Sequence, residues 1–324
     1  MSLEDLGRIV PILPTPLDAS GALDLEGLRH LVRFCAEEGF DGVVVLGSNG
    51  EFPYLTFDEK RRVMAAAVEA AAGRIPVIGT ASAWATDHAV ALARTARDVG
   101  CDAVLAALPT YWAVSADEAR EHFAVLARES GLPVVFYYFP EATGLTLTPR
   151  EIARIAAIDG VVGTKLTVTS ARFLREVVDE TRHRGWRVLT GTTFLLQECL
   201  AAGGAGVFCP LPLVAPALVR EFYEALRRGD RGRSRRLRAR VLRAVPLFSG
   251  VSASPRLQAL GFRILARLPA GTARRRPRPT HGLLKEALRQ RGHPLTAVVR
   301  PPLRPVTPAQ QELVRRTLAE LDRE

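Results

Sequence analysis

The chain has 324 residues, few cysteines and no long hydrophobic run. None of its four cysteines forms a CxxC pair, and all lie among apolar residues or at predicted helix ends. This pattern predicts buried thiols of a cytoplasmic protein rather than disulfides or metal ligands, at Cys35, Cys101, Cys199 and Cys209. No stretch approaches the roughly 18 apolar residues of a membrane span. The start of the chain has no signal-peptide pattern, so we expect no membrane association.

Lysine is also scarce, because only three of the 44 lysine and arginine residues are lysines. Lys60 lies at a charged helix start, and Lys285 lies on a segment that we interpret as a polar helix. Lys165 instead closes the apolar run 160–166, with no acidic neighbour after Asp159. An arginine cannot lose its proton and attack a carbonyl, whereas a desolvated lysine can. Lys165 is therefore a candidate Schiff-base nucleophile, and a lysine that extends from a strand end into solvent is the alternative.

The net charge of +10 requires that nucleic-acid binding be considered. The excess of arginine is concentrated late in the chain, at 227–228, 231–243 and 274–278. No aromatic residues stand between these arginines to stack on bases. A solvated basic surface is therefore favoured, and we expect no nucleic-acid partner.

Eight short, near-continuous apolar runs predict parallel strands that are buried on both faces. They lie at 8–13, 41–46, 76–80, 102–108, 133–139, 161–166, 187–190 and 205–209. Helical patterns alternate with them at 25–38, 58–72, 87–99, 116–129, 149–157, 170–184, 194–202 and 215–228. Thr148 before Pro149 predicts a helix start, as does Thr86. Glycines that follow helices predict their ends, at Gly39, Gly73, Gly100, Gly131 and Gly203.

Eight strands that alternate with helices predict an α/β fold, a closed (β/α)₈ barrel, over residues 1–228. A doubly wound open sheet is the alternative, but it usually carries a nucleotide-binding glycine loop after its first strand, and none is present. Residues 229–324 predict a helical C-terminal extension. Its stretch 250–280 is rich in Arg and Pro and is compatible with a mobile loop.

Polar residues follow several of the predicted strands, at the barrel end where such folds place their chemistry. Ser48 and Asn49 stand between glycines after the second strand, Tyr137 ends the fifth, and Lys165 and Thr167 end the sixth. A lysine, a tyrosine, a serine and a glycine-rich donor loop are the parts of an imine-forming site. Taken singly, each also fits an ordinary turn or core packing.

Taken together, these motifs resemble the dihydrodipicolinate synthase / N-acetylneuraminate lyase superfamily of class I aldolases over nearly the full chain. The resemblance rests on the segments 11–17, 47–51, 137–140 with 143–144, 162–165 and 299–305. It implies a (β/α)₈ barrel with a helical extension, a homotetramer built as a dimer of dimers, and no metal or organic cofactor. It also implies a small-molecule partner, pyruvate or a related 2-oxo acid.

The resemblance further implies the roles of individual residues. Lys165 would form the imine, and Tyr137 and Ser48 would transfer protons. Tyr111 would reach into the site of a neighbouring subunit. The expected substrate contacts are Gly47, Ser48, Asn49, Thr167, Gly191 and Phe208.

Departures from the family pattern bear on the substrate. Dihydrodipicolinate synthases carry an arginine where this chain has Ala142, and sialic-acid lyases carry acidic residues where it has Thr192 and Thr193. The run 47–56 is most similar to 4-hydroxy-2-oxoglutarate aldolases, although the segment 166–169 differs from theirs. We therefore expect a lyase that cleaves or forms a 4-hydroxy-2-oxo acid. Dihydrodipicolinate synthesis, dehydration or cleavage of a 3-deoxy-2-oxo sugar acid, and nucleic-acid binding by the basic region remain the alternatives.

Overall fold

The computed structural model describes residues 8–249 and 280–323. The arginines at 274–278, and all but the last residue of the predicted Arg- and Pro-rich stretch, lie outside the described residues. The division into a barrel up to residue 228 and an extension after it stays a prediction.

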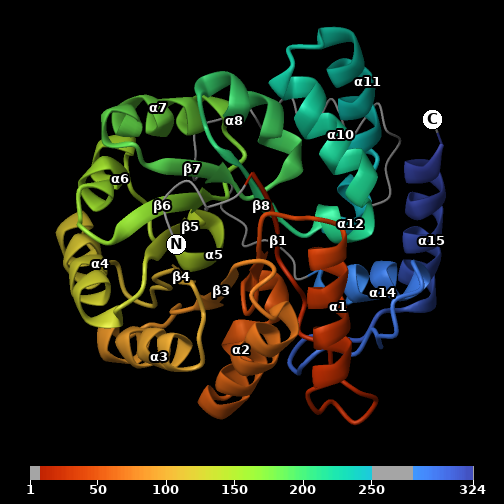
Figure 1. Ribbon diagram of the computed structural model, residues 1–324, viewed down its shortest axis with the longest axis horizontal. Helices are drawn as coiled ribbons and strands as arrows, with labels where there is room; N and C mark the ends of the chain where they lie inside the picture. The colour runs from red at the N-terminus through yellow and green to blue at the C-terminus, as the bar shows by residue number, and fades with distance from the viewer. Residues whose placement is uncertain (1–7, 250–279, 324) are drawn as a thin grey trace.

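The eight parallel strands form one sheet in the order β1-β8-β7-β6-β5-β4-β3-β2. A bridge between Ile12 and Val44 brings the chain after β1 to β2, and a hydrogen bond from the Leu13 N–H to the Val44 carbonyl (2.9 Å) supports it. The nearly closed ring with its outer helices confirms the predicted (β/α)₈ barrel (Figure 1). The strands are β1 (Ile9–Pro11), β2 (Val43–Val44), β3 (Val77–Thr80), β4 (Ala103–Ala106), β5 (Val134–Tyr138), β6 (Val161–Leu166), β7 (Arg187–Thr190) and β8 (Gly206–Cys209).

Each expected helix is present, with ends that differ by a few residues from the prediction. Between the strands lie α1 (Leu25–Glu37), α2 (Phe57–Ala71), α3 (Thr86–Asp98), α4 (Ala116–Ser130), α5 (Pro140–Thr143), α6 (Pro149–Ala156), α7 (Ala171–Thr181) and α8 (Leu196–Ala202). After β8 follow α9 (Leu211–Val214) and α10 (Pro216–Arg227). Short 3₁₀ turns are η2 (Ser48–Gly50), η3 (Phe52–Tyr54), η4 (Arg182–Arg184) and η5 (Thr193–Leu195).

Helix ends follow local chemistry in most places. The Thr148 hydroxyl accepts a hydrogen bond from the Glu151 N–H, and the Thr148 N–H donates to the Glu151 carboxylate, which confirms the predicted start of α6. Thr86 was expected to cap α3, and this prediction is wrong. The cap is Ala85, and the Thr86 hydroxyl lies 3.0 Å from His122 Nδ1 on the neighbouring helix.

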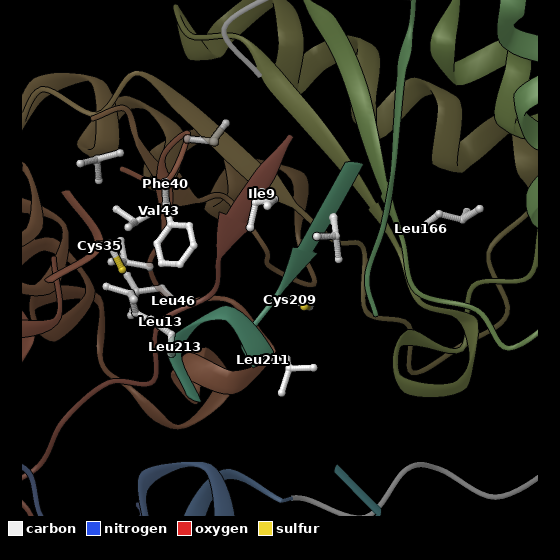
Figure 2. Packing of buried hydrophobic residues seen from close by; sticks show 14 of the residues in the cluster. Ile9, Leu13, Cys35, Phe40, Val43, Leu46, Leu166, Cys209, Leu211 and Leu213 are labelled. Carbon is white, nitrogen blue, oxygen red and sulfur yellow. The ribbon is translucent and has the colours of Figure 1, made fainter. Parts of the chain in front are cut away.

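The core has two layers. One lies inside the barrel and contains Val10, Ile12, Tyr137 and Phe208. The other lies between the strands and the surrounding helices, and Figure 2 shows part of it where Cys35, Phe40 and Val43 pack together. All four cysteines are buried and free, as predicted.

The C-terminal part contributes α11 (Arg231–Leu242), α12 (Val245–Ser249), α14 (His281–Gln290) and α15 (Pro308–Asp322). These helices pack on one another, α11 packs on α10, and α14 packs on α9 beside the barrel (Figure 1). The prediction of a polar helix around Lys285 is wrong, because every residue from Leu283 to Leu288 is buried. Lys285 is thus a second lysine in a buried setting. No helix in the described part of the chain is long and apolar enough to cross a membrane.

Candidate active site

A cavity of about 880 Å³ opens at the carboxyl ends of the barrel strands. The predicted site residues on its wall come from four separate parts of the sequence. The predicted residues on its wall are Ser48, Asn49, Tyr137, Lys165, Thr167 and Gly191.

Lys165 lies near the end of β6, and its side chain is only 2% exposed. It stands opposite Tyr137 in the register of β5 and β6. Its Nζ lies 3.7 Å from the centroid of the Tyr137 ring, and no carboxylate among residues 8–249 and 280–323 forms an ion pair with it. The buried amine therefore faces the Tyr137 ring at the cavity wall, where a bound carbonyl compound could meet it.

The Tyr137 hydroxyl lies 3.1 Å from the Ser48 hydroxyl, so β5 and the turn after β2 meet at hydrogen-bond distance. Ser48 begins η2, a turn bounded by Leu46 and Glu51, which both adopt left-handed backbone angles (φ 59° and 58°). The Thr15 hydroxyl, in the segment after β1, donates to the Gly50 carbonyl (2.7 Å) and anchors the turn. The result is a chain of two hydroxyls that leads from the turn to the ring under Lys165.

Thr167 and Gly191 form a close contact on the cavity wall. A Cβ added at Gly191 would lie 1.9 Å from Thr167 Oγ1 and 2.8 Å from Thr167 Cβ, so only glycine fits beside the threonine. Thr167 Oγ1 is buried and has no hydrogen-bond partner in the described structure. A buried hydroxyl without a partner is costly, which suits a group that hydrogen-bonds a bound ligand.

Three predicted residues are not on the cavity wall. Tyr111 is 74% exposed and stacks on Trp84, with ring centroids 6.2 Å apart. Gly47 stays behind the wall, where a Cβ would lie 2.8 Å from Ile12. Phe208 packs in the barrel interior, whereas the next residue, Cys209, lines the cavity. Phe208 shares this interior cluster with Tyr137, and its contact with substrate stays a prediction.

His281 is a cavity residue that sequence reasoning missed. It opens α14, and its Nε2 lies 2.7 Å from the Ser48 carbonyl oxygen, which can only accept a hydrogen bond. Nε2 is therefore the donor, and Nδ1 has no partner in the described structure. Burial lowers the pKa of His281 and favours the neutral ring. No local pattern could have revealed it, because the contact spans 233 positions of sequence.

The rest of the wall is largely apolar. Ala142 lines the cavity at the place where the family resemblance implies an arginine in synthases, and no arginine lines it in the described structure. Lys60 also lines it, and burial lowers the pKa of its amine. Within residues 8–249 and 280–323, no group of three or more His, Cys, Asp or Glu is placed to hold a metal ion.

Comparison with known proteins agrees with this architecture. The model of the dihydrodipicolinate synthetase family matches residues 5–275. The chain is 36% identical over 264 residues to an uncharacterized DapA-like lyase of Halobacterium salinarum (80% of this chain, 84% of that protein). It is 37% identical over 227 residues to a 4-hydroxy-tetrahydrodipicolinate synthase of Alkalilimnicola ehrlichii (70% and 78%).

Among solved structures, YagE of E. coli K12, a prophage protein of the dihydrodipicolinic acid synthase family in complex with pyruvate, has a TM-score of 0.84. The two are 26% identical, and 98% of each chain is covered. N-acetylneuraminate lyase of Mycoplasma synoviae shares the fold with a TM-score of 0.81 at 19% identity over 98% of this chain and 99% of that chain. The chain therefore belongs to the dihydrodipicolinate synthetase family of class I, pyruvate-dependent lyases and synthases.

Proposed function

We propose that the protein catalyses the reversible aldol cleavage of a 4-hydroxy-2-oxo acid to pyruvate and an aldehyde. The observation that carries this proposal is the buried Lys165 amine against Tyr137, with the Tyr137 hydroxyl in contact with Ser48. A nucleophilic amine with an adjacent proton-transfer pair is what an imine mechanism needs.

The steps follow from this arrangement. The unprotonated Lys165 amine adds to the C2 carbonyl, and loss of water from the adduct leaves an iminium ion. Removal of the C4 hydroxyl proton then breaks the C3–C4 bond, and its electron pair moves to the iminium nitrogen to give an enamine and the free aldehyde. The enamine takes a proton at C3, and water releases pyruvate and the lysine. We assign these proton transfers to Tyr137, with Ser48 as the relay, and the contact between their hydroxyls supports the assignment.

We assign the substrate carboxylate to the turn after β2. Ser48 and Asn49 begin a 3₁₀ turn, and the first N–H groups of such a turn have no partner within it. Successive backbone N–H groups in a tight turn form a concave anion site. Thr167, with its unpartnered hydroxyl, is the further polar contact that we assign to bound substrate.

Condensation of pyruvate with aspartate semialdehyde is a second candidate, since several similar proteins carry the synthase name. It is less well supported, because Ala142 offers no charge to the second carboxylate of that substrate. Dehydration or cleavage of a 3-deoxy-2-oxo sugar acid by the same imine remains open.

We also propose that the protein is a cytoplasmic homotetramer in which Tyr111 reaches toward a neighbouring subunit. The support is a group of exposed aromatic side chains beside the cavity mouth, Trp84, Tyr111 and Trp112, which are 67%, 74% and 79% exposed. Exposed apolar patches of this kind mark association sites.

The test of the activity is imine trapping. Incubation with pyruvate and borohydride should add a reduced pyruvyl group to the peptide that contains Lys165, as read by mass spectrometry. Lys165→Arg should show no adduct and keep the wild-type circular dichroism spectrum, because guanidinium is not a nucleophile at neutral pH. An adduct in Lys165→Arg would assign the nucleophile to another residue.

A further inference from the structure

A buried ion pair joins the carboxylate-binding turn to the C-terminal helix α14. Glu51 closes the turn and is 1% exposed, and Lys285 on α14 is fully buried. Lys285 Nζ lies 2.6 Å from Glu51 Oε1 and donates to the Val298 carbonyl at 2.6 Å. Burial of two charges costs desolvation free energy, which is repaid only when the two groups are paired with good geometry.

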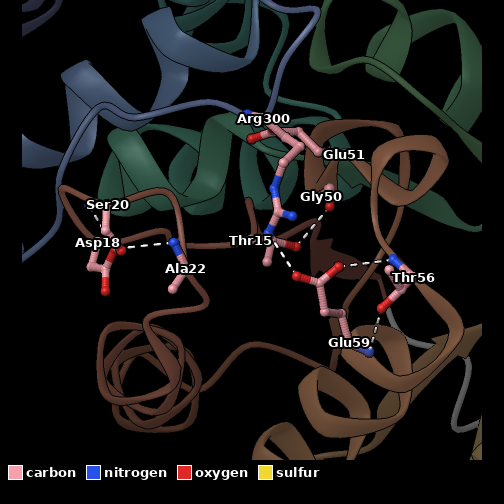
Figure 3. A network of polar contacts seen from close by, with 9 residues as sticks. All are labelled: Thr15, Asp18, Ser20, Ala22, Gly50, Glu51, Thr56, Glu59 and Arg300. Carbon is pink, nitrogen blue, oxygen red and sulfur yellow. Dashed lines mark hydrogen bonds and ion pairs between the residues drawn. The ribbon is translucent and has the colours of Figure 1, made fainter.

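The other oxygen of Glu51 is held from the same part of the chain. The Arg300 N–H donates to Glu51 Oε2 at 2.7 Å, and the Arg300 guanidinium reaches Glu59 Oε1 on α2 at 2.7 Å. Figure 3 shows Arg300 between these two carboxylates, above Gly50 and Thr15. Both carboxylate oxygens of Glu51 are thus fixed by residues more than 230 positions away.

The opposite end of the turn is also held by α14, through the hydrogen bond from His281 Nε2 to the Ser48 carbonyl. The turn needs such support. Leu46 and Glu51 bracket it in left-handed conformations, which side chains with a Cβ adopt only when their surroundings impose them. His281 and Lys285 are four residues apart on α14 and therefore lie on the same face of the helix. This face contacts both ends of the turn after β2.

We propose that α14 is a positioning element for substrate binding, in which Lys285 and His281 act through Glu51 and Ser48 to hold the amides of the turn in place for the 2-oxo acid carboxylate. The inference rests on the proposed function. Loss of the Lys285–Glu51 or His281–Ser48 contact lets the turn relax to a less strained backbone and weakens the binding of pyruvate. Lys165 stands on β6 and Tyr137 on β5, outside the turn, so the imine still forms at saturating pyruvate.

The experiment measures the rate of borohydride trapping against pyruvate concentration. Lys285→Met and Glu51→Gln should each raise the half-saturating pyruvate concentration by about tenfold or more, while the adduct on Lys165 still forms at saturating pyruvate. The double variant should shift no further than either single variant, because both changes break the same contact.

Glu286→Gln is the matched control. Glu286 is the next residue on α14 and is equally buried, but it pairs with Arg289 and Gln290 and not with the turn. This variant should lower the melting temperature and leave the half-saturating concentration unchanged. A merely structural role for the Lys285–Glu51 pair predicts instead that all these variants lose stability and none changes the half-saturating concentration by more than about twofold. That result would overturn the inference.

If Lys285→Met does not fold, His281→Phe decides the matter, because it keeps a ring at this position and removes the bond to Ser48. The same rise in half-saturating pyruvate is expected, and a wild-type saturation curve would refute the inference. Wild-type protein that forms no adduct with pyruvate would overturn the proposed function and this inference with it. Normal trapping in the wild type with unshifted variants would overturn only the inference.

Discussion

His122 makes the stability of this protein depend on pH in a definable window. It lies on α4, is 5% exposed, and contacts Thr86 through Nδ1 while its Nε2 has no partner in the described structure. Burial lowers the pKa of its ring from 6.5 to about 4. The protonated ring would be a buried cation without a counter-charge, so the folded state holds the neutral form.

Proton binding at His122 is linked to unfolding, so its pKa shift fixes how the free energy of unfolding changes with pH. Between about pH 6.5 and pH 4 the unfolded chain binds a proton at this histidine and the folded chain does not, so the free energy of unfolding decreases as pH falls through this window. With these two pKa values, the contribution lost relative to pH 7 is about 2 kcal/mol at pH 5 and about 3 kcal/mol at pH 4.

Urea unfolding of wild type and His122→Gln at several pH values between 4 and 7 tests this. The variant cannot protonate at this position, so its free energy of unfolding should fall less steeply with acid, and the difference between the two slopes should approach the values above. His183→Gln, at an exposed histidine, is the control and should follow the wild type. Parallel curves for wild type and His122→Gln would show that folding does not change the pKa of His122 and would refute the reasoning.

Three further outcomes concern the site. Tyr137→Phe should still trap pyruvate but lower aldol turnover by about 10²–10⁴-fold, because the relay to Ser48 is lost; unchanged turnover would remove Tyr137 from proton transfer. Gly191→Ala should displace Thr167 and destabilise the fold by about 1–3 kcal/mol, measured by urea unfolding, with partial recovery when Thr167→Gly is added. Ala142→Arg should raise condensation of pyruvate with aspartate semialdehyde, followed by a coupled assay, since it adds a cation to the cavity wall. No gain would show that this position does not control substrate choice.

Much of the barrel could be read from local patterns. Parallel strands buried on both faces are apolar throughout, so runs such as 133–139 and 161–166 were recognisable, and the helix start at Thr148 is a local hydrogen-bond motif. Lys165 stood out because so few lysines occur and because its neighbours are apolar.

Local patterns were wrong where a distant partner decides the outcome. Thr86 has the residue type of a cap, but its hydroxyl binds a histidine from another helix. The segment around Lys285 carries charges that suggest a solvent-exposed helix, yet its lysine is neutralised by Glu51 across the fold.

The sequence by itself determined the strand and helix pattern and the residue types of an imine-forming site, because both depend on neighbours within a few positions. Only the tertiary structure decided that Tyr137 lies under Lys165, that His281 enters the cavity, and that α14 grips the turn. These contacts join segments separated by tens to hundreds of residues. Closure of the barrel and packing of the C-terminal helices against it bring them together, and no periodicity in the chain encodes that meeting.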